Sequence, residues 1–344
     1  MKKMFLIILF LFFCNELAFS QTNIIPGAER LNLYLSYLKN KRVGVFANQT
    51  SLVGKEPLVD VLLRHHIHVV KIFSPEHGFL GNKEGGDDIK NKVHIKTGLP
   101  IVSMYGKKFK PSAEDLKDVD VLVFDIQDVG VRFYTYIASL QKLMEAAVDN
   151  HKPLIILDRP NPNGFYVDGP VLEPKFRSFT GMQPVPIVYG MTMGEYAKML
   201  VGERWLMVKP KASAALLHLI VIPCGHYTHN SLYAPPVRPS PNLPDVKSIY
   251  WYPAIGLLET THLSVGRGTS TPFQVLGHPL LHEAFTFVPT VRPEALSPPL
   301  KNKICHGWNL RGDNKTILKK INGKFQLIYL LRAYQLFPDK KHFF

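Results

Sequence analysis

The sequence predicts an α/β protein, in which a parallel sheet forms the first half and a smaller α+β domain the second. Short, continuously apolar runs alternate with segments of helical periodicity, and such runs are typical of strands buried on both faces. Polar residues gather directly after these runs, as they do at the carboxyl edge of a parallel sheet. The alternation at this spacing indicates βαβ units and therefore a Rossmann-like sheet covered by helices.

The elements of the first half follow in order along the chain. The apolar run 44–47 predicts the first strand, and apolar residues on one face of 57–66 predict the first helix. The run 119–126 is almost wholly apolar, with Asp125 near its end, which is typical of a central parallel strand. Helical periodicity then returns over 134–150. Shorter runs predict three more strands, at 68–73, 101–104 and 154–157.

The character of the chain changes near residue 160, where Pro and Gly become frequent. A helix is predicted at 192–200, since Thr192 can cap its first turn and Glu195 stands three residues further on, as in a capping box. A strand is predicted at 217–223. Five prolines between 235 and 244 predict an extended surface segment, of the kind that lines a cleft between two layers.

These elements predict a Rossmann-like domain at 21–185 and an auxiliary α+β domain at 186–344. The chain stops at Phe344 inside an apolar element, so we expect the auxiliary domain to be C-terminally truncated. No G-x-G-x-x-G follows the first strand and no P-loop occurs, so we expect no nucleotide cofactor. No cysteine pair has the spacing of a metal site, and we expect no metal.

The N-terminus has the pattern of a secretory signal peptide at 1–20. Lys2 and Lys3 precede an apolar run at 4–13, and Ala18-Phe19-Ser20 supplies the small residues of a cleavage site. The run is too short to span a bilayer, and no later segment is long and apolar enough to do so. The sequence therefore predicts an exported protein, periplasmic or extracellular, without stable membrane insertion.

Composition narrows the functional classes further. The chain is 46% hydrophobic, as a folded globular protein is, and its formal net charge is +14. Much of this charge lies in residues 301–344, and no basic patch interleaved with aromatic residues occurs elsewhere, so nucleic-acid binding is not expected. After signal cleavage only Cys224 and Cys305 remain, and both a disulfide between them and two buried thiols are compatible with an oxidising compartment.

The stretch Phe73-Ser74-Pro75-Glu76-His77-Gly78-Phe79 is the most informative of the chain. It follows a predicted strand that must stop at Ser-Pro, because Pro has no N–H to donate to a ladder. The turn presents a carboxylate beside an imidazole at the edge of the sheet where chemistry collects. Glu76 is therefore the candidate catalytic acid or base, which makes the first domain the catalytic one.

Several motifs between about residues 40 and 275 together resemble the exo-β-N-acetylmuramidases of the NamZ type. The resemblance implies a Rossmann-like domain with an auxiliary domain, and an active site in the cleft between them. It also implies release of N-acetylmuramic acid from the non-reducing end of peptidoglycan fragments. The motifs that carry it are Phe46-Ala47-Asn48-Gln49-Thr50, Phe73-Ser74-Pro75-Glu76-His77-Gly78, Val123-Phe124-Asp125-Ile126-Gln127-Asp128-Val129-Gly130, Arg132-Phe133-Tyr134-Thr135-Tyr136, Leu157-Asp158-Arg159-Pro160-Asn161-Pro162, Gly169-Pro170-Val171-Leu172-Glu173, Pro239-Ser240-Pro241-Asn242-Leu243-Pro244 and Gly266-Arg267-Gly268-Thr269.

Hydrolysis of a glycoside usually needs two carboxyl groups across the scissile bond. Glu76 is expected to be the acid, with His77 either tuning it by a hydrogen bond or serving a structural role. Glu173, in a Gly/Pro loop, is the first candidate for the partner, ahead of Glu84 and Asp128. The acetamido group of the substrate is an alternative nucleophile.

Recognition of the lactyl carboxylate of N-acetylmuramic acid requires a cation, and Arg binds carboxylates bidentately. Arg267, between two glycines, is the best candidate, followed by Arg132 and Arg159. Internal ion pairs are the alternative role for these arginines. The other predicted substrate-binding residues are Asn48 and Gln49 for sugar hydroxyls, Tyr134 with its neighbours Phe133 and Tyr136 for stacking, and the carboxylates Glu84, Asp125 and Asp128.

Two further functional hypotheses remain open at this stage. An exported esterase or amidase acting on cell-wall material would need a nucleophile with a base, and Ser74 with His77 is the available pair, although no G-x-S-x-G elbow occurs. The other is a non-catalytic peptidoglycan-binding module. The favoured hypothesis is a hydrolase of muramyl saccharides used in cell wall recycling.

Overall fold

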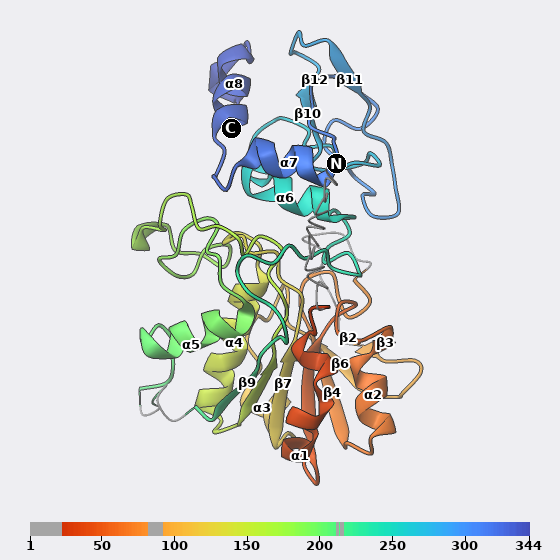
Figure 1. The fold of residues 1–344 in the computed structure, drawn as a ribbon, viewed down its shortest axis with the longest axis vertical. Helices are drawn as coiled ribbons and strands as arrows, with labels where there is room; N and C mark the ends of the chain where they lie inside the picture. Colours follow the sequence, from red (N-terminus) through yellow and green to blue (C-terminus); the bar gives the residue numbers. More distant parts are fainter. Residues whose placement is uncertain (1–22, 82–91, 211–212, 214–216) are drawn as a thin grey trace, which may run out of the picture.

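A computed structural model describes residues 23–81, 92–210, 213 and 217–344. Its centre is a seven-stranded sheet in the order β5-β6-β4-β1-β7-β8-β9. All neighbouring strands run parallel except β5, which is antiparallel to β6 (Figure 1). The strands are β1 (Val43–Ala47), β4 (Val69–Ser74), β5 (Lys92–Val93), β6 (Pro100–Ser103), β7 (Val121–Asp125), β8 (Leu154–Leu157) and β9 (Leu219–Ile222), and a small hairpin of β2 (Leu52–Val53) and β3 (Glu56–Pro57) follows β1.

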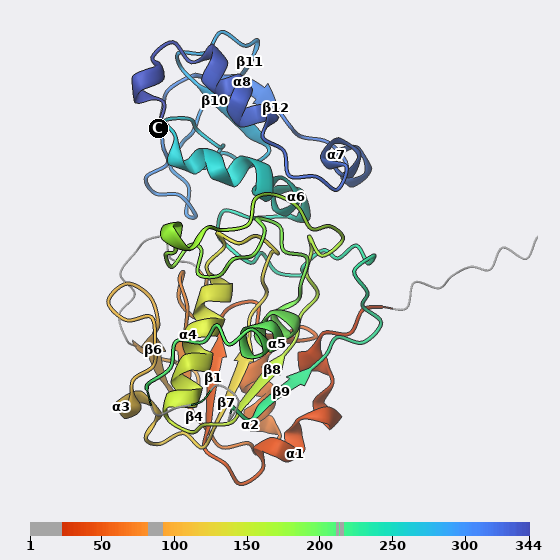
Figure 2. The same cartoon turned by 90° about the vertical axis from the view of Figure 1, so that its left-hand side faces the viewer.

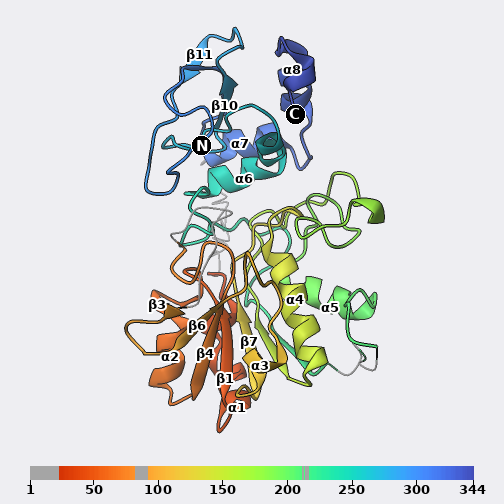
Figure 3. The ribbon, with the colours of Figure 1, turned by 180° about the vertical axis from the view of Figure 1, so that it is seen from behind.

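Helices cover both faces of the sheet because successive strand residues point in opposite directions. On β7, Val123 belongs to one apolar cluster and Phe124 to the other. The cluster of Val123 includes residues of α1 (Leu35–Leu38) and α2 (Leu58–Arg64), and that of Phe124 includes residues of α3 (Ala113–Leu116), α4 (Tyr136–Asp149) and α5 (Met193–Gly202). Figure 3 shows α2 and α4 on opposite sides of the strands.

The auxiliary domain lies beyond the carboxyl ends of the parallel strands (Figure 2). It contains an antiparallel sheet in the order β10-β12-β11. Its elements are α6 (Val246–Ile255), β10 (Val275–His278), β11 (Phe285–Phe287), β12 (Cys305–Asn309), α7 (Asn314–Ile321) and α8 (Ile328–Leu336).

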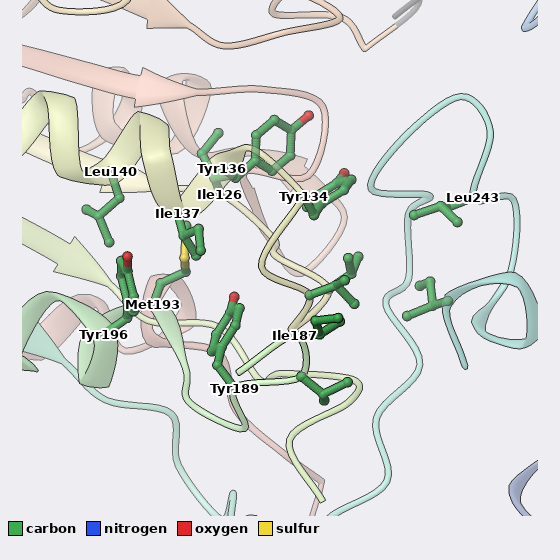
Figure 4. Packing of buried hydrophobic residues seen from close by; sticks show 14 of the residues in the cluster. Ile126, Tyr134, Tyr136, Ile137, Leu140, Ile187, Tyr189, Met193, Tyr196 and Leu243 are labelled. Carbon is green, nitrogen blue, oxygen red and sulfur yellow. The ribbon is translucent and has the colours of Figure 1, made fainter. Parts of the chain in front are cut away.

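One apolar cluster runs from the sheet into the auxiliary domain, since it contains Phe124 as well as Trp251 and Phe273. In Figure 4, Tyr189, Met193 and Tyr196 gather around Ile137 and Leu140 of α4, and Tyr134 lies on the side of Leu243. Because the two domains share this cluster, the edge where they meet is held by packing as well as by the chain connection.

The predicted α/β class and most predicted strands and helices are confirmed. Helix α5 begins after Thr192, whose side chain accepts a hydrogen bond from the backbone N–H of Glu195 while Glu195 returns one to Thr192, so the capping box is complete. Strand β9 pairs with β8, so the parallel sheet includes residues beyond the domain boundary that the sequence predicts at residue 185. In the Pro-rich segment Pro236, Arg238 and Pro244 are exposed, whereas residues 239–243 are buried, so the predicted surface segment is partly wrong.

Both described cysteines are free thiols. Burial raises the pKa of the Cys305 thiol to about 11, which makes it unreactive. Among the described residues, no helix has the length and apolar character needed to cross a membrane. The predicted signal peptide at 1–20 lies outside the described residues.

Candidate functional site

The carboxyl edge of the parallel sheet and the auxiliary domain together line a pocket of about 120 Å³. The first domain contributes the turn after β4 and the start of α4, and the Pro-rich segment closes one side. Helix α6 and the chain that follows it close the other. The pocket is lined by Glu76, His77, Phe133, Tyr134, Thr135, Tyr136, Ser240, Asn242, Leu243, Tyr252, Glu259, Arg267 and Phe273.

The turn that follows β4 places Glu76 in this pocket. The strand ends at Ser74 because Pro75 cannot donate to a ladder, and His77 and Gly78 take left-handed conformations with φ of 68° and 73°. Thr135 Oγ1 donates a hydrogen bond of 3.0 Å to Glu76 Oε2. The hydroxyl of Tyr105 is also hydrogen-bonded to the side chain of Glu76. Burial raises the pKa of Tyr105, and the charge of Glu76 and this hydrogen bond raise it further. Two hydroxyls thus hold the carboxyl group in place.

His77 is buried beside Glu76, and its Nε2 lies 3.4 Å from Oγ of Ser240. The left-handed conformation of His77 turns the chain sharply after β4. Ser74, the nucleophile of the esterase hypothesis, is fully buried, and its Oγ has no hydrogen-bond partner within the described residues. The geometry therefore offers no accessible Ser74–His77 pair.

An aromatic wall runs along one side of the pocket. The rings of Tyr134 and Tyr252 meet edge to face at 5.9 Å, and those of Tyr252 and Phe273 at 5.0 Å. Tyr134 Oη donates to the carbonyl oxygen of Pro239 at 2.9 Å, which fastens the Pro-rich segment to the wall. Burial raises the pKa of Tyr134 and of Tyr252, so both phenols stay neutral.

A carboxylate and a guanidinium from the auxiliary domain face the same pocket. Arg267 stands between Gly266 and Gly268, which both have left-handed φ values, and its Nη1 donates to Glu259 Oε1 at 3.2 Å. Arg267 Nε is buried without a hydrogen-bond partner within the described residues. Burial raises the pKa of Glu259, Arg267 opposes this, and the charge of Glu76 adds to it.

The predicted residues Asp125 and Arg159 form an internal ion pair instead of lining the pocket. Arg159 Nε and Nη2 donate to the two carboxylate oxygens at 2.5 and 2.9 Å, and Nη2 also donates to the carbonyl of Leu52. The two side chains are 0% and 3% exposed. Burial lowers the pKa of Arg159, but the charge of Asp125 raises it by more, so the pKa of Arg159 lies above its usual value. This pair connects the end of β7 to the loop that follows β8.

Asp128 and Arg132 are also occupied by structural contacts. Asp128 Oδ2 accepts hydrogen bonds from the backbone N–H of Gly130 at 2.6 Å and from the hydroxyl of Tyr189. Arg132 Nη1 donates to two backbone carbonyls, those of Pro170 and Val185. Neither side chain lines the pocket.

Asn48 and Gln49 form a layer behind the pocket wall. Asn48 Nδ2 donates to Tyr136 Oη at 3.1 Å, and its Oδ1 accepts from Thr50. Gln49 Nε2 donates to the carbonyls of Arg238 and Pro239, both at 3.1 Å. These contacts position pocket residues, and neither amide lines the pocket itself.

The structure does not bring Glu173 to the pocket. This residue lies on an exposed loop, its side chain is 63% exposed, and it pairs with Lys175. Glu84 lies outside the described residues. Among the described residues, no three His, Cys, Asp or Glu side chains are grouped so that they could hold a metal ion.

Burial raises the pKa of Asp128 to about 7, against hydrogen bonds that lower it. A carboxyl group with a raised pKa stabilises the fold at low pH, and that contribution is lost as pH rises through about 4 to 7. At about 1.4 kcal/mol per pKa unit, the loss is on the order of 4 kcal/mol. We expect Asp128→Asn to reduce the drop in unfolding free energy between pH 5 and pH 8, measured by urea titration. Equal drops in Asp128→Asn and wild type would contradict this, and Glu173→Gln, on the exposed loop, is the control.

The sequence did not single out Glu259, Tyr252, Ser240 or Asn242 as site residues. Glu259 follows the apolar run of α6 and stands eight residues before Arg267. A carboxylate at the end of an otherwise apolar segment is the sequence signal that could have identified Glu259 as a site residue. Tyr252 had none, since an aromatic residue within an apolar helix is typical of a core position.

Comparison with known proteins identifies the family of this chain. The family model "Exo-beta-N-acetylmuramidase NamZ, N-terminal" matches residues 43–247, and the corresponding C-terminal model matches residues 250–343. Over 329 residues the chain is 36% identical to the peptidoglycan β-N-acetylmuramidase NamZ of Bacillus subtilis (strain 168), which covers 90% of this chain and 77% of that relative.

Two crystal structures of DUF1343 family proteins from Bacteroides fragilis NCTC 9343 are similar throughout. One has a TM-score of 0.84 and 46% identity, covering 94% of this chain and 86% of that one. The other has a TM-score of 0.75 and 29% identity, covering 93% and 86%. With both family models matched in order along the chain, the protein belongs to the exo-β-N-acetylmuramidase NamZ family.

Proposed function

We propose that the protein is an exo-acting glycoside hydrolase that releases N-acetylmuramic acid from the non-reducing end of peptidoglycan fragments. Membership of the NamZ family supports this activity. The observation that carries it is the pocket between the two domains, which places the carboxyl group of Glu76 opposite a guanidinium and beside an aromatic wall.

Glu76 acts as the general acid in this proposal. A glycosidic oxygen leaves readily only when it is protonated as the bond to the anomeric carbon breaks, and a positioned carboxylic acid supplies that proton. Thr135 and Tyr105 hold the Glu76 side chain in one orientation. His77 fixes the turn against Ser240 and so serves as a positioning residue.

Arg267 binds the lactyl carboxylate of the muramyl sugar. Its Nε has no hydrogen-bond partner within the described residues although it is buried, and an unsatisfied guanidinium N–H in a pocket calls for an acceptor from the ligand. The adjacent rings of Tyr134 and Tyr252 give the sugar an apolar face to pack on.

Replacing Arg267 tests this recognition. We expect Arg267→Met to lower kcat/KM for a chromogenic muramide about 10- to 100-fold. This fold-change corresponds to about 1.5–3 kcal/mol, which is what a hydrogen bond to a charged group contributes. The same muramide with its lactyl carboxylate converted to an amide should lose less, because the charge that Arg267 binds is already gone. Arg332→Met, which breaks a pair of equal length with Glu283 in which the arginine is more exposed, is the control. Equal losses on both substrates would rule out lactyl recognition by Arg267.

Export of the protein, and a role in cell wall recycling, belong to the same proposal. The signal-peptide pattern of residues 1–20 supports export, and the wall polymer that holds the substrate lies outside the cell membrane. Fractionation of the producing cells, with mass determination of the mature N-terminus, tests it. A mature chain beginning at Gln21 in the exported fraction is expected.

The activity itself is tested with a disaccharide of N-acetylmuramic acid β-linked to N-acetylglucosamine. Incubation with the purified protein should give both free sugars, detected by mass spectrometry. Retention of peptidoglycan with no sugar released at any pH would instead support the binding-module hypothesis.

A further inference from the structure

Building on the proposed hydrolase function, we propose that Glu259 is the second carboxylate of the reaction. It belongs to the auxiliary domain and accepts a proton from the attacking water, whereas Glu76 of the first domain is the acid. Glu259 stands in the short 3₁₀ segment Gly256–Thr260 that follows α6, whereas Glu76 stands after β4 of the first domain. Both side chains line the same pocket. The catalytic pair is then complete only when the two domains are packed together.

Other described carboxylates that sequence analysis favoured are unsuited to this role. Asp125 is buried in its ion pair with Arg159. Asp128 is buried and does not line the pocket, although its Oδ1 has no hydrogen-bond partner within the described residues. Glu173 is exposed and pairs with Lys175. Within the described part of the chain, the carboxylates that line the pocket are those of Glu76 and Glu259.

Glu259 is oriented and still has an oxygen to offer. Arg267 Nη1 donates to Oε1, and among the described residues no hydrogen bond reaches Oε2. A base needs this combination, because one oxygen fixes the direction of the carboxylate while the other accepts the proton. The side chain is 30% exposed, so water can reach it.

Charge balance in the pocket supports a proton-accepting role. Burial and the neighbouring charge of Glu76 raise the pKa of Glu259, while Arg267 lowers it. A base works best when its pKa approaches the working pH, whereas a carboxylate nucleophile should be fully ionised. Because the charge of Glu76 is one cause of the raised pKa of Glu259, loss of that charge favours the ionised form of Glu259.

The reaction then runs in one displacement. Oxygen of a water molecule forms the new bond to the anomeric carbon as Glu259 takes one of the water protons. The bond between that carbon and the leaving oxygen breaks, and the leaving oxygen takes the proton of Glu76. Glu259 ends protonated and Glu76 ionised, and exchange with solvent restores both. Because attack comes from the face opposite the leaving group, the released sugar should first appear as the α-anomer.

Two substitutions separate catalysis from positioning. In Glu259→Gln the amide oxygen still accepts from Arg267 but cannot take a proton, and we expect kcat to fall about 10²- to 10⁴-fold with little change in KM. Glu259→Ala removes both contacts and opens space, so added azide should restore turnover and yield a glycosyl azide. Glu283→Gln, at the Arg332 pair of the same domain, is the matched control and should behave as wild type.

The outcomes that would overturn the role of Glu259 differ from those that would overturn the hydrolase. A rise in KM with kcat unchanged in Glu259→Gln would make Glu259 a positioning residue for Arg267. Release of the β-anomer by the wild-type protein, followed by NMR, would exclude direct attack by water. Circular dichroism and thermal unfolding of each variant confirm folding. Loss of the proposed function itself would appear as no sugar release by the wild-type protein.

Discussion

Glu76→Gln should lower kcat for release of N-acetylmuramic acid about 10²- to 10⁴-fold and leave KM nearly unchanged. Glutamine has the shape of glutamate, and its amide oxygen can still accept the hydrogen bond from Thr135. What it lacks is an acidic proton for the leaving oxygen. A chromogenic muramide with a good leaving group should lose less than the natural disaccharide, because such a leaving group departs without protonation.

The comparison of these two substrates in Glu76→Gln and wild type is the measurement, made by initial rates over a range of pH. Glu173→Gln serves as the matched control, since its side chain is exposed and lies outside the pocket. Equal losses on both substrates would show that Glu76 does not protonate the leaving group.

Arg159→Met should lower the free energy of unfolding by about 3–5 kcal/mol, because it leaves the charge of Asp125 buried without a partner. The pair also joins the end of β7 to the start of the loop after β8. Loss of the guanidinium also removes the hydrogen bond to the carbonyl of Leu52. Urea unfolding followed by circular dichroism gives the value.

Arg42→Met is the control for this substitution. Arg42 pairs with Asp120 in a similar geometry, but the two side chains are 44% and 38% exposed, and exposed pairs contribute about 0–1 kcal/mol. Adding Asp125→Leu to Arg159→Met should recover part of the lost stability, because the unpaired charge disappears. A loss for Arg159→Met no greater than that for Arg42→Met would contradict the structural role of the pair.

The parallel sheet could be predicted from sequence because its central strands carry their signal locally. Residues 154–157 and 119–126 are apolar runs whose burial on both faces leaves them little freedom to be anything else. The capping box of α5 is equally local, since Thr192 and Glu195 are three residues apart.

The domain boundary could not be predicted in this way. Strand β9 lies after a Gly- and Pro-rich stretch, and the pairing of Leu154 with Leu219 spans a long segment of chain that no short window reveals. The run 217–223 was recognised as a strand, but which sheet it joins depends on long-range contacts. Those contacts place it in the parallel sheet.

The candidate site was predictable where one side chain stands in a distinctive turn, as Glu76 does. Arg159 and Arg267 look alike in sequence, each beside Gly or Pro at the end of an apolar stretch. Only the fold shows that Arg159 faces Asp125 inside the protein, and that Nε of Arg267 has no hydrogen-bond partner among the residues that the structure describes. Glu259 belongs to the second domain and is far from Glu76 along the chain, so the sequence does not show that the two residues line one pocket.

The most direct test uses two peptide-free chains of alternating N-acetylglucosamine and N-acetylmuramic acid that differ in which sugar stands at the non-reducing end. The purified protein should release free N-acetylmuramic acid from the chain that begins with this sugar and leave the other chain intact, as mass spectrometry over time would show. Cleavage inside either chain, or release of N-acetylglucosamine from the second, would contradict an exo-acting muramidase.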